Sequence, residues 1–131
     1  MIEHSLTVRV RYGETDQMGV VYHANYFLYF EMGRTELLRS AGQAYSDLEK
    51  QGLYLVVTES RCRHRAAARY DELLRVTTRV ANVGKASLRF EYTVHGPDGK
   101  LLAEGHTALA AVDGDRRPRR LPEGILRLFA S

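Results

Sequence analysis

One change of hydrophobic period constrains the fold of this 131-residue chain more than any other feature of its sequence. Residues 24–42 carry apolar side chains at helical spacing: Tyr26, Phe27, Phe30, Gly33, Leu37, Leu38 and Ala41. From residue 53 onward, apolar and polar residues alternate, as in strands that bury one face. One long apolar helix and several one-sided strands bury their apolar surfaces together when the strands curl around the helix.

The alternating segments predict five antiparallel strands. One strand precedes the helix, at residues 5–12, and its inward face is expected to carry Leu6, Val8, Val10 and Tyr12. Four strands follow the helix, at residues 53–70, 72–84, 85–99 and 100–114. The turn sequences NVGK and GPDGK join the last three strands into a meander of hairpins.

Short helices complete the predicted architecture. One is expected at residues 45–51, with Ser46 as its N-cap, and another at residues 123–131. The predicted fold class is α+β, with a five-stranded antiparallel sheet wrapped around one long central helix. Residues 1–131 are expected to form a single domain.

Composition excludes several classes of protein. The chain is 44% hydrophobic and 27% charged, which is ordinary for a globular domain and sufficient for a core without metal or disulfide support. Cys62 is the only cysteine, so no intramolecular disulfide is possible, and this fits a cytoplasmic location. The sequence has neither a signal peptide nor an apolar stretch long enough to span a bilayer. The net charge of +3, without a recognisable motif, does not predict nucleic-acid binding.

Most basic residues are arginines, and strand parity places many of them on the outward face of the sheet. The arginines expected there are Arg9, Arg11, Arg61, Arg63, Arg65, Arg75, Arg79 and Arg89, with Glu59 and Glu91 beside them. This face has three interpretations: a solvated surface of salt bridges, a subunit interface built on Arg–Glu pairs, or a landing surface for the phosphates of a nucleotide. The sequence does not distinguish between them.

The segment YGETDQMGVVYHANY (12–26), between the first strand and the long helix, holds the candidate site. Its polar residues also have structural interpretations: Asp16 as a turn or capping residue, His23 as a helix-start residue, and Tyr12 as part of the core. Asp16 is suited to chemistry, because a carboxylate can act as a nucleophile or as a general base on water.

The stretch YGETDQMGVVYHANYFLYFEMGRTELL resembles the signature of the hotdog-fold acyl-CoA thioesterases. It is similar to the 4-hydroxybenzoyl-CoA thioesterase family and, within it, to the branch associated with the Tol-Pal cell-envelope system. The spacing of Tyr12, Asp16 and His23, followed by an aromatic helix, matches that family. The stretches ARYDELLRVTTRVANVGKASLRFEYTV, EGHTALAAVD and RPRRLPE are similar as well, so the resemblance covers nearly the whole chain.

The resemblance implies hydrolysis of a fatty or aromatic acyl-CoA to the free acid and CoA, without a cofactor. It implies that Asp16 is the catalytic aspartate, flanked by Tyr12 and His23. It also implies homodimers, often paired into tetramers, with the active site at the dimer interface. Oxyanion stabilisation is expected from free N–H groups at the helix start, around Tyr22 and His23. The expected substrate-binding residues are Gly19, Val20, Tyr22, Arg63 and Arg65.

Other activities fit the sequence less well. The stretches H-F-P-G and D-x-N-P-x-H of acyl dehydratases are absent, and so is the G-x-S-x-G of serine esterases. The five histidines lack metal-ligand spacing, so no metal is expected. The main alternative is a non-catalytic acyl-binding or cell-envelope-associated interaction protein on the same fold. Such a protein does not need the Asp16 carboxylate, so Asp16→Asn distinguishes the two hypotheses.

Overall fold

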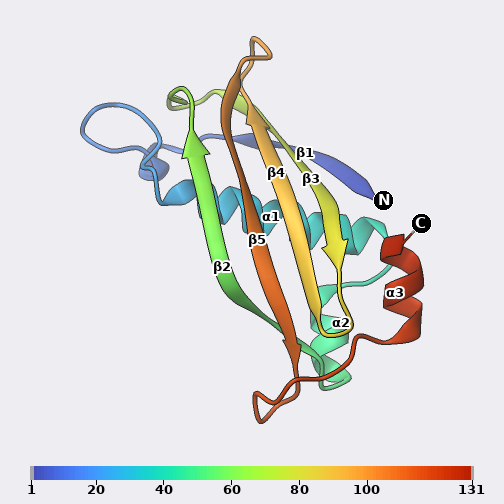
Figure 1. Cartoon of the computed structure of the whole chain (residues 1–131). Coiled ribbons are helices and arrows are strands. Elements are labelled where there is room, and N and C mark those ends of the chain that lie inside the picture. Colours follow the sequence, from blue (N-terminus) through green and yellow to red (C-terminus); the bar gives the residue numbers. More distant parts are fainter. Residues whose placement is uncertain (1, 131) are drawn as a thin grey trace.

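The computed structural model of the chain describes residues 2–130 and contains one antiparallel sheet with helices on one side (Figure 1). The strands are β1 (Glu3–Arg9), β2 (Tyr54–His64), β3 (Leu73–Val83), β4 (Ser87–His95) and β5 (Leu101–Val112). The helices are α1 (Asn25–Ser40), α2 (Tyr45–Lys50) and α3 (Glu123–Ala130), and a 3-10 helix, η1 (Tyr12–Glu14), follows β1. The strand order is β1-β3-β4-β5-β2, so β1 and β2 are the edges of the sheet.

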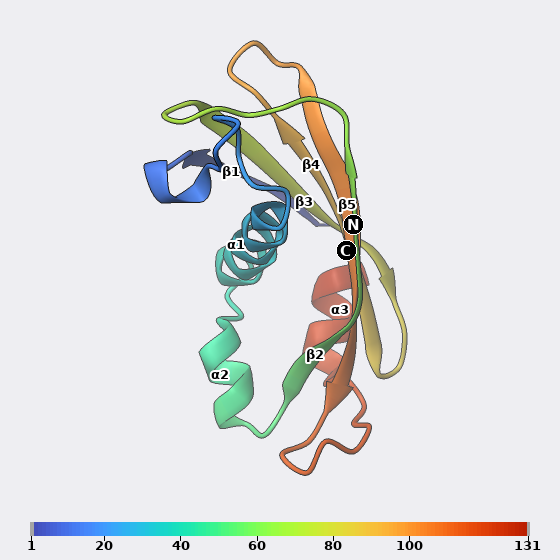
Figure 2. The same cartoon turned by 90° about the vertical axis from the view of Figure 1, so that its left-hand side faces the viewer.

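The sheet wraps around α1, and α3 also lies against its inner face, while α2 follows the end of α1 on the same side of the sheet (Figure 2). Phe30 of α1 stacks on Tyr92 of β4 with ring centroids 4.3 Å apart. Gly33 allows α1 to approach β3 closely, because a Cβ at this position would collide with the Thr78 hydroxyl. Phe129 of α3 is fully buried and extends the same core. The hydrophobic core therefore fills the space between the helices and one face of the sheet.

The predicted architecture is confirmed. The long helix, the β3–β4–β5 meander and both short helices form where the sequence pattern placed them, and Ser131, the last residue of the predicted terminal helix, lies outside the described residues. Gly42 and Gly52 follow α1 and α2 with φ of +83° and +80°, a left-handed conformation that favours glycine after a helix. Among the helices of residues 2–130, none has both the length and the apolar character that crossing a membrane requires.

All five strands end before their predicted segments do, and for the first two strands this takes candidate residues out of the sheet. The pairing of β1 with β3 ends at Arg9, and the chain then turns into η1. Tyr12 therefore does not continue the inward face of β1, and its side chain is 78% exposed. The second strand ends at His64 rather than at Tyr70, because the chain leaves the sheet there and forms an irregular connection to β3.

Two details of the helices were also predicted wrongly. Ser46 does not cap α2, which begins at Tyr45 with Ala44 in the N-cap position. In α1, Phe27 belongs to the predicted apolar stripe but is 39% exposed. Tyr29 lies outside the predicted stripe and is fully buried, because its hydroxyl has a polar partner inside the protein.

Candidate functional site

The loop between η1 and α1 is a short antiparallel ladder. The Asp16 N–H donates to the Val20 carbonyl, and the Tyr22 N–H donates to the Glu14 carbonyl, both at 2.9 Å. Gly19 makes the turn between these two segments with φ of +79°, a conformation that favours glycine. The ladder places Asp16 near the residues that open α1, because Tyr22 is followed directly by the helix start.

Further hydrogen bonds fix this ladder to the connection that follows β2. The Val21 N–H donates to the Ala68 carbonyl at 2.8 Å, and Val20 forms an isolated bridge with Arg69. In Figure 1 the loop projects beyond the β2 edge of the sheet. The candidate site therefore lies at the β2 side of the molecule, close to the end of that strand.

The Asp16 carboxylate is half-buried and has one hydrogen-bond partner among residues 2–130. Its Oδ1 accepts the Met18 N–H at 2.9 Å, so the carboxylate also closes the turn of the loop. No residue of the described chain donates a hydrogen bond to Oδ2. The turn interpretation of Asp16 is therefore correct, and it leaves one oxygen of the carboxylate available for a substrate or a water molecule.

Some backbone N–H groups at the start of α1 donate hydrogen bonds, and others have no acceptor among the described residues. The Tyr22 N–H is used by Glu14, and the N–H groups of Asn25, Tyr26 and Phe27 donate to carbonyls three residues earlier. Within residues 2–130, the N–H groups of His23 and Ala24 have no acceptor. The Tyr22 N–H, one of the expected oxyanion donors, is therefore already used, while the N–H groups of His23 and Ala24 remain unpaired in the described chain. Both stand at the positive end of the helix dipole.

Glu14 is a functional candidate that the sequence reasoning missed. Its side chain is only 9% exposed and accepts hydrogen bonds from the Arg11 N–H and guanidinium, both at 3.0 Å, and from the Tyr29 hydroxyl at 2.9 Å. Its carbonyl accepts the Asn25 side-chain amide at 2.8 Å, in addition to the Tyr22 N–H. Glu14 therefore connects the end of β1, the Asp16 loop and the first turns of α1.

Replacing Glu14 by glutamine is expected to lower the free energy of unfolding by about 1–2 kcal/mol at neutral pH, because a charge-assisted acceptor is lost. Burial raises the pKa of Glu14, but the hydrogen bonds from Arg11 and Tyr29 outweigh it, and the net pKa lies below 4.5. A lowered pKa stabilises the fold above the unfolded value, and this stabilisation disappears as the pH falls through the folded value. The difference from the parent should therefore shrink below about pH 4 in urea unfolding.

A matched control for this measurement is Glu49→Gln, which removes an exposed carboxylate from α2. Its difference from the parent protein should be small and should not change with pH. A Glu14→Gln difference of the same size in neutral and in acidic buffer would contradict the assigned role of the Glu14 charge.

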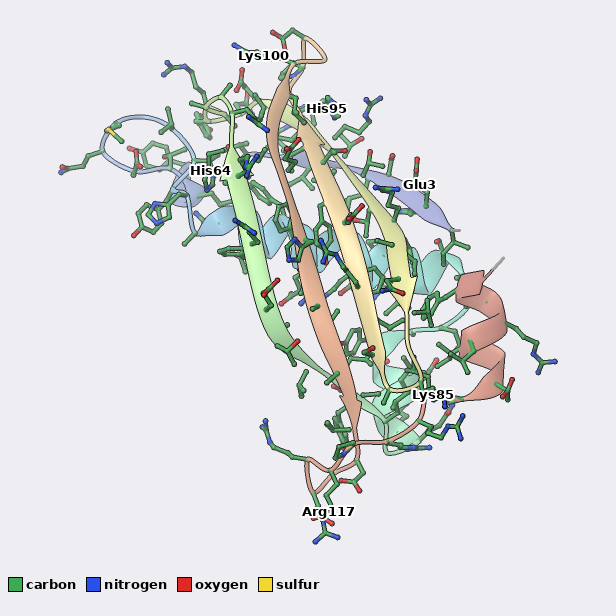
Figure 3. All side chains as sticks on the ribbon, in the orientation of Figure 1. Glu3, His64, Lys85, His95, Lys100 and Arg117 are labelled. Carbon is green, nitrogen blue, oxygen red and sulfur yellow. The ribbon has the colours of Figure 1, made fainter. Side chains whose placement is uncertain are left out.

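An aromatic cluster lies beside the helix start. The His23 ring is 4.5 Å from the Tyr22 ring and 6.3 Å from the His64 ring, measured between centroids. His64 also meets Tyr26 edge to face at 5.0 Å. Figure 3 shows His64 at the end of β2, next to the Asp16 loop. His64 is a second residue that sequence reasoning missed, because only strand pairing brings it to the site.

The remaining predicted residues make their contacts with groups other than Asp16. Tyr12 packs edge to face on Tyr70 with centroids 5.6 Å apart, and no hydrogen bond within residues 2–130 joins it to Asp16. Arg65 donates to Glu104 at 2.9 Å, and Arg63 lies on the outward face of the sheet. In the described part of the chain, no three His, Cys, Asp or Glu side chains are grouped as metal ligands.

A carboxylate with an unpaired oxygen, in a loop that leads into a helix start with unpaired N–H groups, is found here in a chain that matches a known family almost from end to end. Residues 10–129 match the family described as the Thioesterase-like superfamily. The chain belongs to this superfamily. Membership in the Thioesterase-like superfamily confirms the family resemblance seen in the sequence and the expected enzyme class, a thioester hydrolase.

Individual relatives are similar to this chain over most of their length. The Haemophilus influenzae protein named Acyl-CoA thioesterase YbgC is 37% identical over 127 residues, which cover 95% of this chain and 93% of that protein. The Acyl-CoA thioester hydrolase YbgC of Escherichia coli O6:H1 is 34% identical over 123 residues, covering 93% and 92%. The crystal structure of DHNA-CoA thioesterase from Staphylococcus aureus has a TM-score of 0.95 at 30% identity, over 99% of this chain and 90% of that one. This likeness confirms the hotdog fold.

Proposed function

We propose that the protein hydrolyses acyl-CoA thioesters to the free acid and CoA, with Asp16 as nucleophile or general base. The observation that carries the proposal is the ladder that holds Asp16 near the unpaired N–H groups of His23 and Ala24. The names of the E. coli, H. influenzae and S. aureus relatives specify CoA thioesters, which supports the same substrate class for this chain.

Asp16 supports two routes for breaking the thioester. In the first, the free carboxylate oxygen attacks the carbonyl carbon, the C–S bond breaks, and the thiolate leaves and takes a proton from solvent. Water then hydrolyses the mixed anhydride and restores Asp16. In the second route, Asp16 takes a proton from water as the water oxygen attacks the same carbon; the C–S bond then breaks, and the CoA thiolate leaves and takes the proton that Asp16 held. Both routes form an oxyanion, which the His23 and Ala24 N–H groups can stabilise.

Other residues of the loop serve substrate binding in this proposal. Gly19 and Val20 form the side of the ladder that approaches the thioester, and open space surrounds Gly19. Tyr22, 47% exposed, and the His23 ring provide an aromatic wall beside the helix start. Tyr12 is left out of the catalytic step, because in the described part of the chain no hydrogen bond joins its hydroxyl to Asp16. Arg65 is left out because Glu104 already neutralises it.

We further propose a homodimer along β2, and pairing of such dimers into a tetramer. β2 is an edge strand, and an exposed edge can pair with a second copy of the same chain. The Asp16 loop projects past this edge in Figure 1 and exposes Met18 by 79%, while Val57 of β2 is 48% exposed. A partner on this edge would cover both side chains and would enclose the thioester site.

A cytoplasmic location is part of the same proposal. Its support is the single cysteine of the chain, Cys62, which leaves no possibility of an intramolecular disulfide.

Cys62 lies on β2, half-buried against the core. Burial raises the pKa of the Cys62 thiol to about 11, so the thiol stays protonated and poorly reactive at neutral pH. Cys62 is therefore a structural residue and not a nucleophile of the reaction.

A thiol-release assay on the purified protein tests the proposal. Short-chain, medium-chain, long-chain and aromatic acyl-CoAs are supplied in parallel, and release of CoA is followed with a thiol reagent. We expect hydrolysis of at least one member of the panel. Binding of acyl-CoAs without hydrolysis of any of them would instead favour the non-catalytic acyl-binding protein.

A further inference from the structure

The face of the sheet that points away from α1 contains a hollow of about 810 Å³, and the residues of the Asp16 loop do not line it. Small residues from four of the strands form its floor: Ser5, Thr77, Thr93 and Gly105. Five arginines line it: Arg61, Arg63, Arg75, Arg79 and Arg89. Figure 3 views this face, on which Glu3 and His95 are labelled. The parity prediction of outward-pointing arginines is confirmed for these five.

The arginines of the hollow fall into two groups. Arg79 and Arg89 share Glu91 as a partner, and the Arg89–Glu91 separation is 3.7 Å. Within residues 2–130, no carboxylate lies within ion-pair distance of Arg61, Arg63 or Arg75. Three guanidinium groups around one hollow therefore keep their charge and their forked donors available. Such donors suit phosphate oxygens.

The acidic residues of the hollow do not cancel these three charges. Glu91 is occupied by two arginines, and Glu104 is bound by Arg65 at 2.9 Å. Glu3 also lines the hollow, but it stands on β1, at the opposite edge of the sheet from Arg61 and Arg63. The β2 side of the hollow is therefore its positive side.

The strand register gives the span of the positive groups. Arg63 of β2 faces Glu104 of β5, Glu104 faces Thr93 of β4, and Thr93 faces Thr77 of β3, two residues from Arg75. Three inter-strand spacings separate β2 from β3, which is roughly 14 Å. The hollow is therefore wide enough to hold more than one phosphate group at a time.

We propose that this hollow binds the phosphorylated nucleotide end of CoA and so makes the protein selective for CoA thioesters. The proposal rests on the proposed function. Arg63 and His64 are neighbours at the end of β2 and point to opposite faces, so the hollow begins one residue away from the catalytic side. The flexible arm of CoA can pass around the strand end and bring its diphosphate and ribose phosphate to Arg61, Arg63 and Arg75. A thioester that lacks the nucleotide has no phosphate groups for these arginines to bind, so they do not increase its affinity.

The test compares two thioesters of the same acyl group, one of CoA and one of N-acetylcysteamine. The triple variant Arg61→Gln, Arg63→Gln, Arg75→Gln is expected to raise KM for the acyl-CoA by ~10-fold or more, since charged hydrogen bonds to phosphates are lost. Its kcat for the acyl-CoA and its KM for the N-acetylcysteamine thioester should not change. Free CoA should bind the parent protein in calorimetry and should bind the variant at least ~10-fold more weakly.

The matched control is the triple variant Arg116→Gln, Arg120→Gln, Arg127→Gln, which removes the same charge from exposed positions outside the hollow. It should keep the parent KM, and this would separate the hollow from the general effect of net charge. An unchanged KM for acyl-CoA in the first variant would overturn the proposal. If that variant also lost self-association in ultracentrifugation, the hollow would instead be a contact between copies of the chain. If the parent hydrolyses neither thioester but binds free CoA, the proposed function fails and the nucleotide site stands.

Discussion

Replacing Asp16 by asparagine is expected to lower kcat for the preferred acyl-CoA by ~100-fold or more, the usual scale for losing a nucleophile or a general base. The substitution is well suited to this site, because an asparagine oxygen can still accept the Met18 N–H that Asp16 now accepts at 2.9 Å. The turn and the ladder with Val20 should therefore persist. Only the negative charge and the basicity are lost. Thiol release at saturating substrate measures kcat, and thermal unfolding should give an unchanged midpoint.

The control for this prediction is Asp115→Asn, in the exposed loop that follows β5. It changes the charge by the same amount in a position remote from the loop of Asp16, and its kcat should equal that of the parent. A kcat close to the parental value in Asp16→Asn, with the midpoint also unchanged, would show that Asp16 acts only as a turn residue. The non-catalytic interpretation of the fold would then gain its main support.

The fold was largely predictable from the sequence because its signals are local and repeated. The period-two pattern of β4 places Leu88, Phe90, Tyr92 and Val94 on one face, and all four are buried. The same rule failed at Tyr12, because the alternation of apolar and polar residues does not show where the pairing of β1 with β3 ends. Val10 is still buried, so the pattern held for one residue beyond the strand and then broke where Glu14 draws the chain into η1.

The candidate site was predictable in part. Asp16 could be identified because the residues around it form a recognisable motif with helical aromatic residues behind it. Glu14 could not be identified, because its role depends on its burial and on a hydrogen bond from Tyr29, fifteen residues later. Residue spacing also does not predict the hydrogen bond from the Tyr22 N–H to the Glu14 carbonyl, nor the contact between the His64 and His23 rings. These contacts depend on the loop geometry and on the register of β2 in the sheet.

Replacing Gly105 by alanine is expected to lower the free energy of unfolding by about 3 kcal/mol, the upper end of the usual cost of overpacking. Gly105 lies opposite Cys62 in the β2–β5 pair. A Cβ at this position would collide with the Arg61 carbonyl oxygen and would lie 2.8 Å from Cε2 of Phe30. Phe30 is itself held by its stacking on Tyr92, so it cannot turn away freely. The thermal midpoint should fall by roughly 10 °C, measured at equal protein concentration.

Gly114→Ala is the control, because an alanine Cβ at this position would have no atom of residues 2–130 within 4 Å beyond its chain neighbours. It should change the free energy of unfolding by no more than about 0.5 kcal/mol. The clash at Gly105 involves a backbone oxygen, which no change of rotamer can relieve, so β2 must move away from β5. That movement would carry His64 away from His23, and kcat/KM should fall even at temperatures where the variant is fully folded. A stability and an activity equal to those of the parent would mean that β2 and β5 tolerate a wider spacing at this point. The position of the edge strand would then not control the site.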